Sequence, residues 1–323
     1  MKLKTIKTDE AVGQILCHDI TKIVPGEFKG RIFKKGHIVR EEDIEVLLSC
    51  GKDILYVWEN IEGFIHENDA AKRLKDVLLG DNLELSDIKE GKISLIASET
   101  GTLRVDENAL YNINMIDEVI VATKPNFTFV KKGDKVASTR VIPLLVDEKK
   151  LIEAEKHAGK LISVKPLSRK TVAMVTTGNE VFYGRIKDKF REVMAPKLDY
   201  FGCEFVGQTI VPDELDKVTS AINKYLAEGV ELIICTGGMS VDPSDITPSA
   251  IMATGSEIVT YGMPVLSGSM TLIAYNEDTP IIGLPAGVLF SEKSTVDVIL
   301  HRLLSNDKIT REEVARYGVG GLL

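Results

Sequence analysis

The sequence predicts an α/β protein: a three-layer αβα domain with a mostly parallel sheet, preceded by a β-rich mixed N-terminal region. Three observations support this fold class. From residue 166 onward, short apolar runs typical of buried strands alternate with stretches of helical length. Several of these runs end abruptly in glycine-containing turns, as strands of open α/β sheets do. Before residue 166, short alternating stretches are separated by tight turns, which is typical of neighbouring β-strands.

The length and composition indicate about two domains. The chain has 323 residues, of which 44% are hydrophobic, so each domain can bury a core. Residues 164–170 interrupt the pattern, and we place the boundary there, between a region 1–165 and a domain 166–323. The first ten residues are charged and polar, and all apolar runs are short, which predicts neither a signal peptide nor a membrane span. We therefore expect a cytoplasmic protein without a membrane partner.

The charge distribution restricts the kinds of ligand. The formal net charge of -8 and the lack of a long basic stripe argue against a nucleic-acid partner. The four cysteines and five histidines are scattered, so the spacing predicts no structural zinc site. An anionic ligand must therefore be held locally by backbone amides and a few side chains in one pocket.

The N-terminal region mixes strands and helices. Apolar residues at helical spacing predict helices over residues 41–50 and 68–79, each followed by a glycine. Residues 93–143 alternate in the manner of strands, and residues 147–160 form a charged helical stretch. We interpret residues 1–60 as structural.

Beyond the boundary the predicted elements follow in a regular order. Strands are expected at 171–175, 204–211, 231–235, 256–260, 271–275 and 280–284. Helices are expected at 187–201 and 214–228, from residue 247 onward, and at about 290–304. This alternation predicts helices on both faces of the sheet.

The stretch from residue 230 to 253 organises this domain. Its apolar run ends in Thr236-Gly237-Gly238, where the missing side chains would let a ligand approach the backbone. Thr247 and Pro248 then predict a helix start, with a hydroxyl at the N-cap and proline at the first helical position. A strand, a glycine turn and a helix start together predict a cradle for an anion such as phosphate. An ordinary connection between strand and helix is the alternative interpretation.

Two carboxylates follow the glycine turn. Asp242 and Asp245 stand in a loop where they would repel an anionic ligand if nothing else were bound. They are better explained as ligands of a metal ion or as groups that transfer protons.

Several glycine-bearing turns are expected to surround one crevice, because the ends of parallel strands meet at one edge of a sheet. Besides the turn at Gly237, these segments contain Thr177 and Gly178, then Pro285, Ala286 and Gly287, and on the rim Ser267 and Gly268. Neither a P-loop nor a dinucleotide-binding fingerprint is present in the sequence.

Four motifs, in this order and spacing, resemble the molybdopterin-binding domain of molybdenum cofactor biosynthesis proteins. They are T-T-G-N-E-V at 176–181, G-R-I-K-D-K at 184–189, T-G-G-M-S-V-D-P-S-D-I-T-P at 236–248 and G-L-P-A-G at 283–287. Residues 1–60 are also similar to the opening of the molybdopterin molybdenumtransferases related to gephyrin's E domain. The resemblance implies that the domain binds molybdopterin or its adenylylated form and inserts molybdate with the help of Mg²⁺. It also implies a homodimer and a molybdoenzyme client.

The resemblance assigns roles to matching positions. It implies that the phosphate is held by Thr236, Gly237, Gly238 and Ser240, and that Gly178, Glu180 and Asp188 belong to the first binding loops. Asp245, Asp242 and Glu180 are the expected catalytic residues, and Asp242 and Asp245 are the expected metal ligands. The expected cofactor-binding residues are Thr177, Gly178, Asp188, Thr236, Gly237, Gly238, Ser240, Ser267, Gly268, Pro285, Ala286 and Gly287.

The sequence departs from that family at three places. Lys189 and Phe190 stand where the transferases tend to carry an asparagine, and residues 266–269 read L-S-G-S where they carry P-G-K-P. The C-terminal β domain common in those enzymes is not expected after residue 323, which indicates a shorter branch. Two hypotheses follow: an enzyme that inserts molybdate, or a non-catalytic carrier or regulator that binds molybdopterin.

Overall fold

The computed structural model describes residues 4–24, 26–57, 62–240 and 245–323. Its contacts divide the chain into two compact units. The first unit comprises residues up to 98 together with 105–126 and 133–163, and the second comprises 99–104, 127–132 and 164–323. Residues 99–104 and 127–132, which the sequence analysis assigned to the N-terminal region, therefore group with the second unit. None of the helices in the described ranges is long and apolar enough to cross a membrane.

The first unit is β-rich and mixed, as predicted. Its largest sheet is antiparallel, in the order β6 (Leu83–Leu85), β7 (Ile93–Ala97), β11 (Lys135–Val141), β9 (Val119–Thr123). Three helices accompany it: α2 (Glu67–Leu78), α3 (Glu107–Asn114) and α4 (Glu148–Glu155). The remaining elements are η1 (Thr8–Glu10), α1 (Asp43–Ser49) and the strand pairs β1 (Thr5–Lys7) with β4 (Ile54–Tyr56), β2 (Ile20–Val24) with β3 (Phe28–Phe33), and β5 (Phe64–His66) with β12 (Leu145–Asp147).

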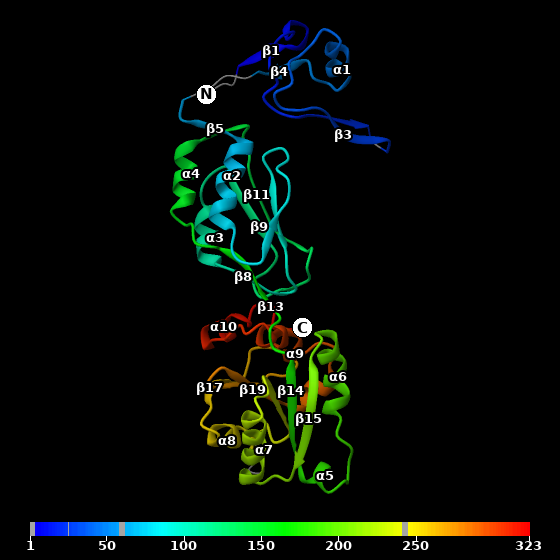
Figure 1. The fold of residues 1–323 in the computed structure, drawn as a ribbon, viewed down its shortest axis with the longest axis vertical. Helices are drawn as coiled ribbons and strands as arrows, with labels where there is room; N and C mark the ends of the chain where they lie inside the picture. Colours follow the sequence, from blue (N-terminus) through cyan, green and yellow to red (C-terminus); the bar gives the residue numbers. More distant parts are fainter. Residues whose placement is uncertain (1–3, 25, 58–61, 241–244) are drawn as a thin grey trace. The chain divides into compact units, whose positions relative to one another are not determined.

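The second unit is built on a six-stranded, mostly parallel sheet (Figure 1), which confirms the predicted fold class. The strand order is β15 (Glu204–Val211), β14 (Thr171–Thr177), β16 (Leu232–Thr236), β19 (Thr279–Leu284), β18 (Leu272–Asn276), β17 (Glu257–Tyr261). The first four strands are parallel, whereas β18 and β17 are antiparallel to their neighbours. Only residues 277 and 278 connect β18 to β19. A connection of two residues can join only antiparallel neighbours, which explains the reversal.

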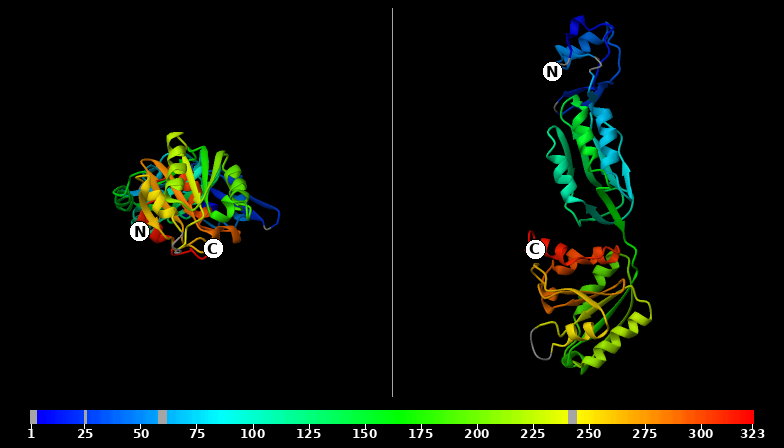
Figure 2. Two further views of the ribbon diagram at one scale, coloured as in Figure 1. Left: turned by 90° about the horizontal axis from the view of Figure 1, so that it is seen from below. Right: turned by 90° about the vertical axis from the view of Figure 1, so that its left-hand side faces the viewer.

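Helices cover both faces of this sheet (Figure 2). On one face, α6 (Phe190–Tyr200) and α9 (Thr295–Leu304) contribute to a core that includes Met174 and Ile234. On the other, α7 (Leu215–Ala227) and α8 (Thr247–Ala253) contribute to a core that includes Val175 and Ile233. Successive residues of a strand point to opposite faces, so strands covered on both sides are apolar throughout. The uninterrupted apolar run that ends at Thr236 is this kind of strand.

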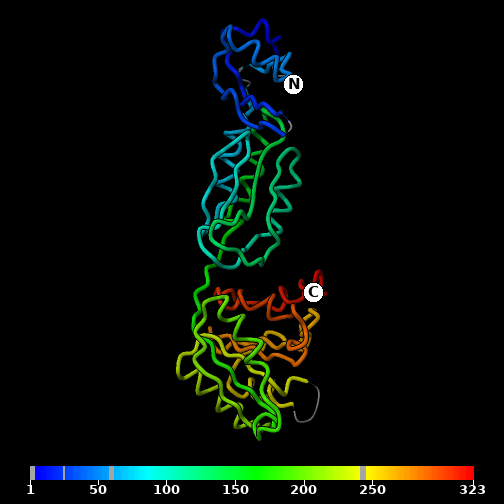
Figure 3. The backbone as a smooth tube through the Cα atoms, turned by 90° about the vertical axis from the view of Figure 1, so that its right-hand side faces the viewer, coloured from blue at the N-terminus to red at the C-terminus, as the bar shows by residue number. Residues whose placement is uncertain are grey.

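The C-terminal part of the chain differs from the prediction of one helix over 290–304. Residues Ala286–Phe290 form a 3₁₀ helix, η2, and α9 begins only at Thr295. Ser294 and Asp297 form a capping box there, which defines the start of α9. Two further helices were not predicted, α5 (Asn179–Phe182) and α10 (Arg311–Arg316). The backbone path through η2, α9 and α10 can be followed in Figure 3.

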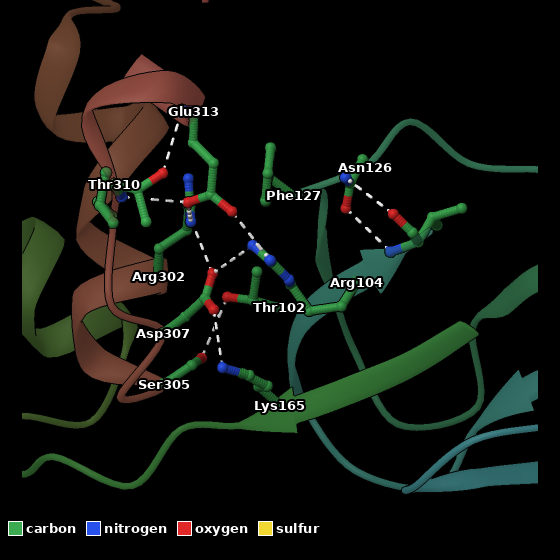
Figure 4. A network of polar contacts seen from close by, with 12 residues as sticks. Thr102, Arg104, Asn126, Phe127, Lys165, Arg302, Ser305, Asp307, Thr310 and Glu313 are labelled. Atoms are coloured by element: carbon green, nitrogen blue, oxygen red, sulfur yellow. Dashed lines mark hydrogen bonds and ion pairs between the residues drawn. The ribbon is translucent and has the colours of Figure 1, made fainter. Parts of the chain in front are cut away.

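A network of charged side chains attaches an additional small sheet to α9 and α10 (Figure 4). The sheet has the order β10 (Phe129–Val130), β8 (Gly101–Val105), β13 (Ile162–Pro166). Arg302 on α9 is fully buried and binds Asp307 at 2.8 Å and Glu313 at 2.6 Å. Arg104 on β8 and Lys165 on β13 bind the same Asp307, at 3.1 and 2.9 Å. A buried guanidinium needs such partners, because an isolated charge is costly to desolvate.

Candidate functional site

The carboxyl ends of the parallel strands lie side by side. Thr176 on β14 is in register with Thr236 on β16, and Thr236 is in register with Leu284 on β19. On the other side of β14, Thr177 is in register with Val211, the last residue of β15. The turns that follow these strands therefore start from one edge of the sheet, where open α/β folds bind their ligands.

The Thr236-Gly237-Gly238 turn packs directly against the end of β14. Both glycines have positive φ, +83° and +54°. A Cβ atom at Gly237 would lie 2.0 Å from the carbonyl oxygen of Thr177, far closer than real Cβ contacts. Glycine is therefore required here by the backbone conformation and by the packing of β14 against the turn.

Thr247 stabilises this turn and does not cap the helix that follows. The helix α8 begins at Thr247, its N-cap residue is Ile246, and no side chain of the described residues caps it. The Thr247 hydroxyl donates instead to the Gly237 carbonyl at 2.8 Å, and the Thr247 amide contacts the Gly238 carbonyl. The prediction of Thr247 as the N-cap is therefore wrong, because the nearby turn offers its hydroxyl a carbonyl acceptor. Pro248 does lie in the first turn of α8, as expected.

The first glycine turn is held by an aspartate that the sequence analysis missed. The Thr177 hydroxyl donates to one oxygen of Asp213 at 2.7 Å, and the Asn179 amide donates to the other at 2.9 Å. Asp213 follows the end of β15, so its place after a predicted strand could have drawn attention to it. Gly178 lies between Thr177 and Asn179 and has φ +146°. A Cβ atom at Gly178 would lie 3.1 Å from a carboxylate oxygen of Glu180. The exposed Glu180 side chain is thus next to Gly178.

Asp188 is linked to the strand ends through hydrogen bonds. Its carboxylate accepts from the Phe190 amide at the start of α6, at 3.0 Å, and from the side-chain amide of Gln208 at 2.7 Å. The same amide of Gln208 contacts the Thr176 hydroxyl at 2.8 Å, and Thr176 and Thr236 share a hydrogen bond of 2.9 Å. Gln208 was not predicted as a site residue. This chain of contacts joins Asp188 to the Thr236 end of the central strand.

A cavity of about 610 Å³ brings together six of the predicted residues: Ser240, Ser267, Gly268, Pro285, Ala286 and Gly287. The Ser267 hydroxyl donates to the Gly287 carbonyl at 2.7 Å, which connects two of its walls. Leu266, Leu322 and Leu323 also line it, and the Leu266 and Leu322 backbones pair as a parallel bridge. The wall formed by residues 322 and 323 was not foreseen.

The segment after the glycine turn is tied to β17. The Tyr261 hydroxyl donates to the Met239 carbonyl at 2.9 Å. Burial and the negative charge of Asp245 both raise the pKa of Tyr261. Asp242 lies outside the described residues. Within the described residues, no group of three or more histidine, cysteine, aspartate or glutamate side chains is arranged to hold a metal ion.

A second cavity of about 480 Å³ shares a wall with the first. Tyr261 and Arg311 line it, and Ser269 lines both cavities. Among the described residues that line the two cavities, Arg311 is the only lysine or arginine. It therefore supplies positive charge beside a cavity whose other polar groups are hydroxyls and backbone amides.

Two family models match the chain. Residues 173–306 match a family described as "Probable molybdopterin binding domain". Residues 5–59 match a family described as "Domain of unknown function (DUF8806)". The first match contains all the predicted site residues.

Sequence relatives carry related names. A molybdopterin molybdenumtransferase of Staphylococcus epidermidis is 24% identical over 292 residues, which cover 86% of this chain and 65% of that protein. A molybdopterin molybdenumtransferase of Synechococcus elongatus is 24% identical over 115 residues, 33% of this chain and 28% of that protein. A CinA-like protein of a Mycobacterium species is 32% identical over 78 residues, 24% of this chain and 18% of that protein. The matches thus span less than two thirds of the length of each of these relatives.

Solved structures that are similar to part of the chain were also found. The molybdopterin biosynthesis enzyme MoaB of Thermus thermophilus is 20% identical, with a TM-score of 0.36 and coverage of 44% of this chain and 98% of that one. The protein CinA of Thermoplasma acidophilum is 18% identical, with a TM-score of 0.38 and coverage of 42% and 98%. The family model and the sequence relatives thus support a molybdopterin-binding domain over residues 173–306 of this chain.

Proposed function

We propose that this protein binds molybdopterin or adenylylated molybdopterin at the carboxyl edge of the six-stranded sheet and inserts molybdate during molybdenum cofactor biosynthesis. The observation that supports this most is the cavity of about 610 Å³, a volume typical of small-molecule sites. Its walls come from the turns after β16 and β19 and from residues 266–270, which are distant in the sequence.

The phosphate of the ligand is proposed to lie against the Thr236-Gly237-Gly238 turn. Glycine turns with positive φ expose backbone N–H groups that bind anions. Ser240 on the cavity wall can add a hydroxyl donor, and Arg311 can add a charged donor from the neighbouring cavity. In this arrangement backbone N–H groups and a hydroxyl provide most of the contacts to the phosphate. Such neutral donors suit a protein whose net charge is negative.

Mg²⁺ is proposed to bind through Asp242 and Asp245 together with the phosphates of the substrate. Mg²⁺ in proteins commonly takes only one or two carboxylates and completes its shell with phosphate oxygens and water. The donor chemistry of this loop therefore suits the ion without a ready-made group of three protein ligands. When bound, the ion would neutralise charge on the phosphoanhydride during cleavage. Glu180, next to Gly178, is the proposed proton-transfer group.

A non-catalytic carrier or regulator remains the alternative function. One observation favours it: among the described residues that line the larger cavity there is no lysine or arginine. A site that only holds the pterin needs less positive charge than one that stabilises the transition state of phosphoanhydride cleavage. A carrier would pass its ligand to a molybdoenzyme client.

The decisive experiment incubates the purified protein with adenylylated molybdopterin, Mg²⁺ and molybdate, and measures AMP release and metal-loaded cofactor. AMP release supports the enzyme, and binding without AMP release supports the carrier. Ala286→Trp, at an exposed position of the cavity wall, should abolish binding, whereas Ala158→Trp, at an exposed position of the first unit, should not. If the protein binds neither form of molybdopterin, both functions are rejected.

We also propose that the protein forms a homodimer. Among the described residues, no third strand pairs with the two-stranded sheet of β2 and β3, and Ile23 and Phe28 on it are 62% and 48% exposed. Exposed apolar strands of this kind are commonly covered by a second subunit. Sedimentation velocity tests the proposal, and a monomer at every micromolar concentration would reject it.

A further inference from the structure

The second unit contains a third cavity, of about 380 Å³, whose lining shares no residue with the candidate functional site. It lies among β10, α6 and α9, and its lining is mostly apolar. Three aromatic side chains form part of its wall: Phe129 on β10, Tyr200 at the end of α6, and Phe201 directly after it. Its volume lies within the range of small-molecule sites, so the cavity can hold a ligand of modest size.

The three aromatic rings hold one another in a fixed arrangement. The ring centres of Phe129 and Phe201 are 5.1 Å apart with an interplanar angle of 88°, and those of Tyr200 and Phe201 are 5.1 Å apart at 79°. Phe129 and Tyr200 are 6.0 Å apart at 60°. These are edge-to-face contacts, the geometry that aromatic pairs prefer. The wall therefore offers ring faces and edges to a flat aromatic guest without first having to reorganise.

The imidazole ring of His301 is a polar group of the wall whose donor and acceptor nitrogens can be assigned. His301 on α9 is buried, and its Nε2 lies 2.8 Å from the Phe127 carbonyl oxygen. A carbonyl only accepts, so Nε2 carries the hydrogen. Burial lowers the pKa of His301, so the ring is neutral at pH 7 and Nδ1 keeps its lone pair. His301, which lines the cavity, thus has one ring nitrogen that can accept a hydrogen bond.

The charges near the cavity disfavour a cationic ligand. The Lys197 ammonium and the Asp297 carboxylate, both in the lining, form an ion pair. The Asp297 carboxylate also accepts from the backbone amide of Ser294. The Lys131 ammonium lies 5.1 Å from the centre of the Tyr200 ring. A ligand cation would therefore meet two ammonium groups and one carboxylate that is already paired.

We propose that this cavity binds a small, flat, uncharged aromatic molecule of about two fused rings that carries one N–H or O–H donor. The rings would pack against Phe129, Tyr200 and Phe201, and the donor would bind Nδ1 of His301. This site is independent of the molybdopterin site, since none of its residues belongs to the proposed binding machinery. Its failure would leave the proposed function untouched.

Indole is the probe for this proposal, because it has two fused rings and one N–H. Calorimetry should show binding of indole to the full chain, and benzothiophene, which has the same shape without the donor, should bind about tenfold more weakly. Tyr200→Ala should weaken indole binding at least fivefold, since it removes one of the three aromatic side chains of the wall, at a position that is 60% exposed. Tyr111→Ala, at a 64% exposed position of α3 in the first unit, is the matched control and should change nothing.

Methyl NMR locates the bound probe. Indole should shift the methyl resonances of Val296 and Leu300, which line the cavity, through its ring current. Three results would each overturn the proposal: no binding of indole at millimolar concentration, equal binding by the wild type and Tyr200→Ala, or displacement of indole by tetramethylammonium. Equal affinity for indole and benzothiophene would refute the role of His301 as acceptor.

Discussion

Replacing Gly237 by alanine tests whether the glycine turn is defined by its packing against β14. Two costs add up at this position. Alanine in the left-handed region costs about 1–2 kcal/mol, and its φ here would be +83°. The new Cβ would also lie 2.0 Å from the Thr177 carbonyl oxygen and 2.9 Å from its carbon, both backbone atoms that cannot rotate away. Overpacking of this kind costs about 1–3 kcal/mol, so we expect Gly237→Ala to destabilise the second unit by about 2–5 kcal/mol.

Gly229→Ala is the matched control. Gly229 lies in the same unit with a similar φ of +74°, but a Cβ there has no atom within 4 Å. It should therefore cost only the conformational term, about 1–2 kcal/mol. The difference between the two variants isolates the clash with Thr177.

Native-state hydrogen exchange measured by mass spectrometry is the assay, because it reports the opening of β14 and β16 separately from the first unit. Gly237→Ala should raise the equilibrium constant for opening of these strands about 5- to 150-fold more than Gly229→Ala does. This factor corresponds to the cost of the clash, about 1–3 kcal/mol. Equal effects of the two variants would refute the reasoning, since they would show that the turn accommodates a side chain.

Three further predictions concern charged residues. Asp245→Asn removes one negative charge at nearly constant size and should leave molybdopterin affinity equal or tighter while AMP release collapses; full activity would leave the aspartate a structural role. Arg302→Met removes the buried partner that Asp307 and Glu313 share and should lower the free energy of unfolding by about 3–5 kcal/mol in urea titrations. Burial alone would raise the pKa of Asp307, and Arg302 with neighbouring cations lowers it below its ordinary value. The stability that comes from this lowered pKa should therefore be lost as the pH falls below about 4, and Arg302→Met should show a smaller loss, because Lys165 and Arg104 still lower the pKa of Asp307. Arg311→Gln should weaken binding of molybdopterin about tenfold by calorimetry, whereas Arg316→Gln on the same helix should not.

The sequence alone determined the main features of the second unit, because they depend on local patterns. Strand β15 was predicted over 204–211 and observed as Glu204–Val211, and the apolar run before Thr236 was predicted as a buried strand. The alternation of strands and helices predicted a mostly parallel sheet. In a parallel sheet the turns that follow the strands lie at one edge. The four motifs and their order then pointed to the family.

The tertiary structure decided which polar side chains hold those turns. Asp213 and Gln208, which bind Thr177 and Thr176, lie more than 30 residues away from them in the sequence, so no local pattern identified them. Thr247 had the spacing of an N-cap, yet its hydroxyl binds the turn that folds back beside it. A short-range pattern states what a residue can bind, whereas only the folded chain decides which acceptor is near.

The same distinction separates the two halves of the chain. Periodicity identified strands in the N-terminal region but could not show that residues 99–104 and 127–132 group with the second unit. That grouping depends on contacts such as Arg104 with Asp307, about 200 positions apart, and on the buried Arg302 beside them. A buried ion network forms only where opposite charges from distant segments meet, because each charge alone would lose too much hydration. Local sequence reasoning has no access to such pairs, and for that reason the cavity lined by Phe129 and His301 became visible only in the folded structure.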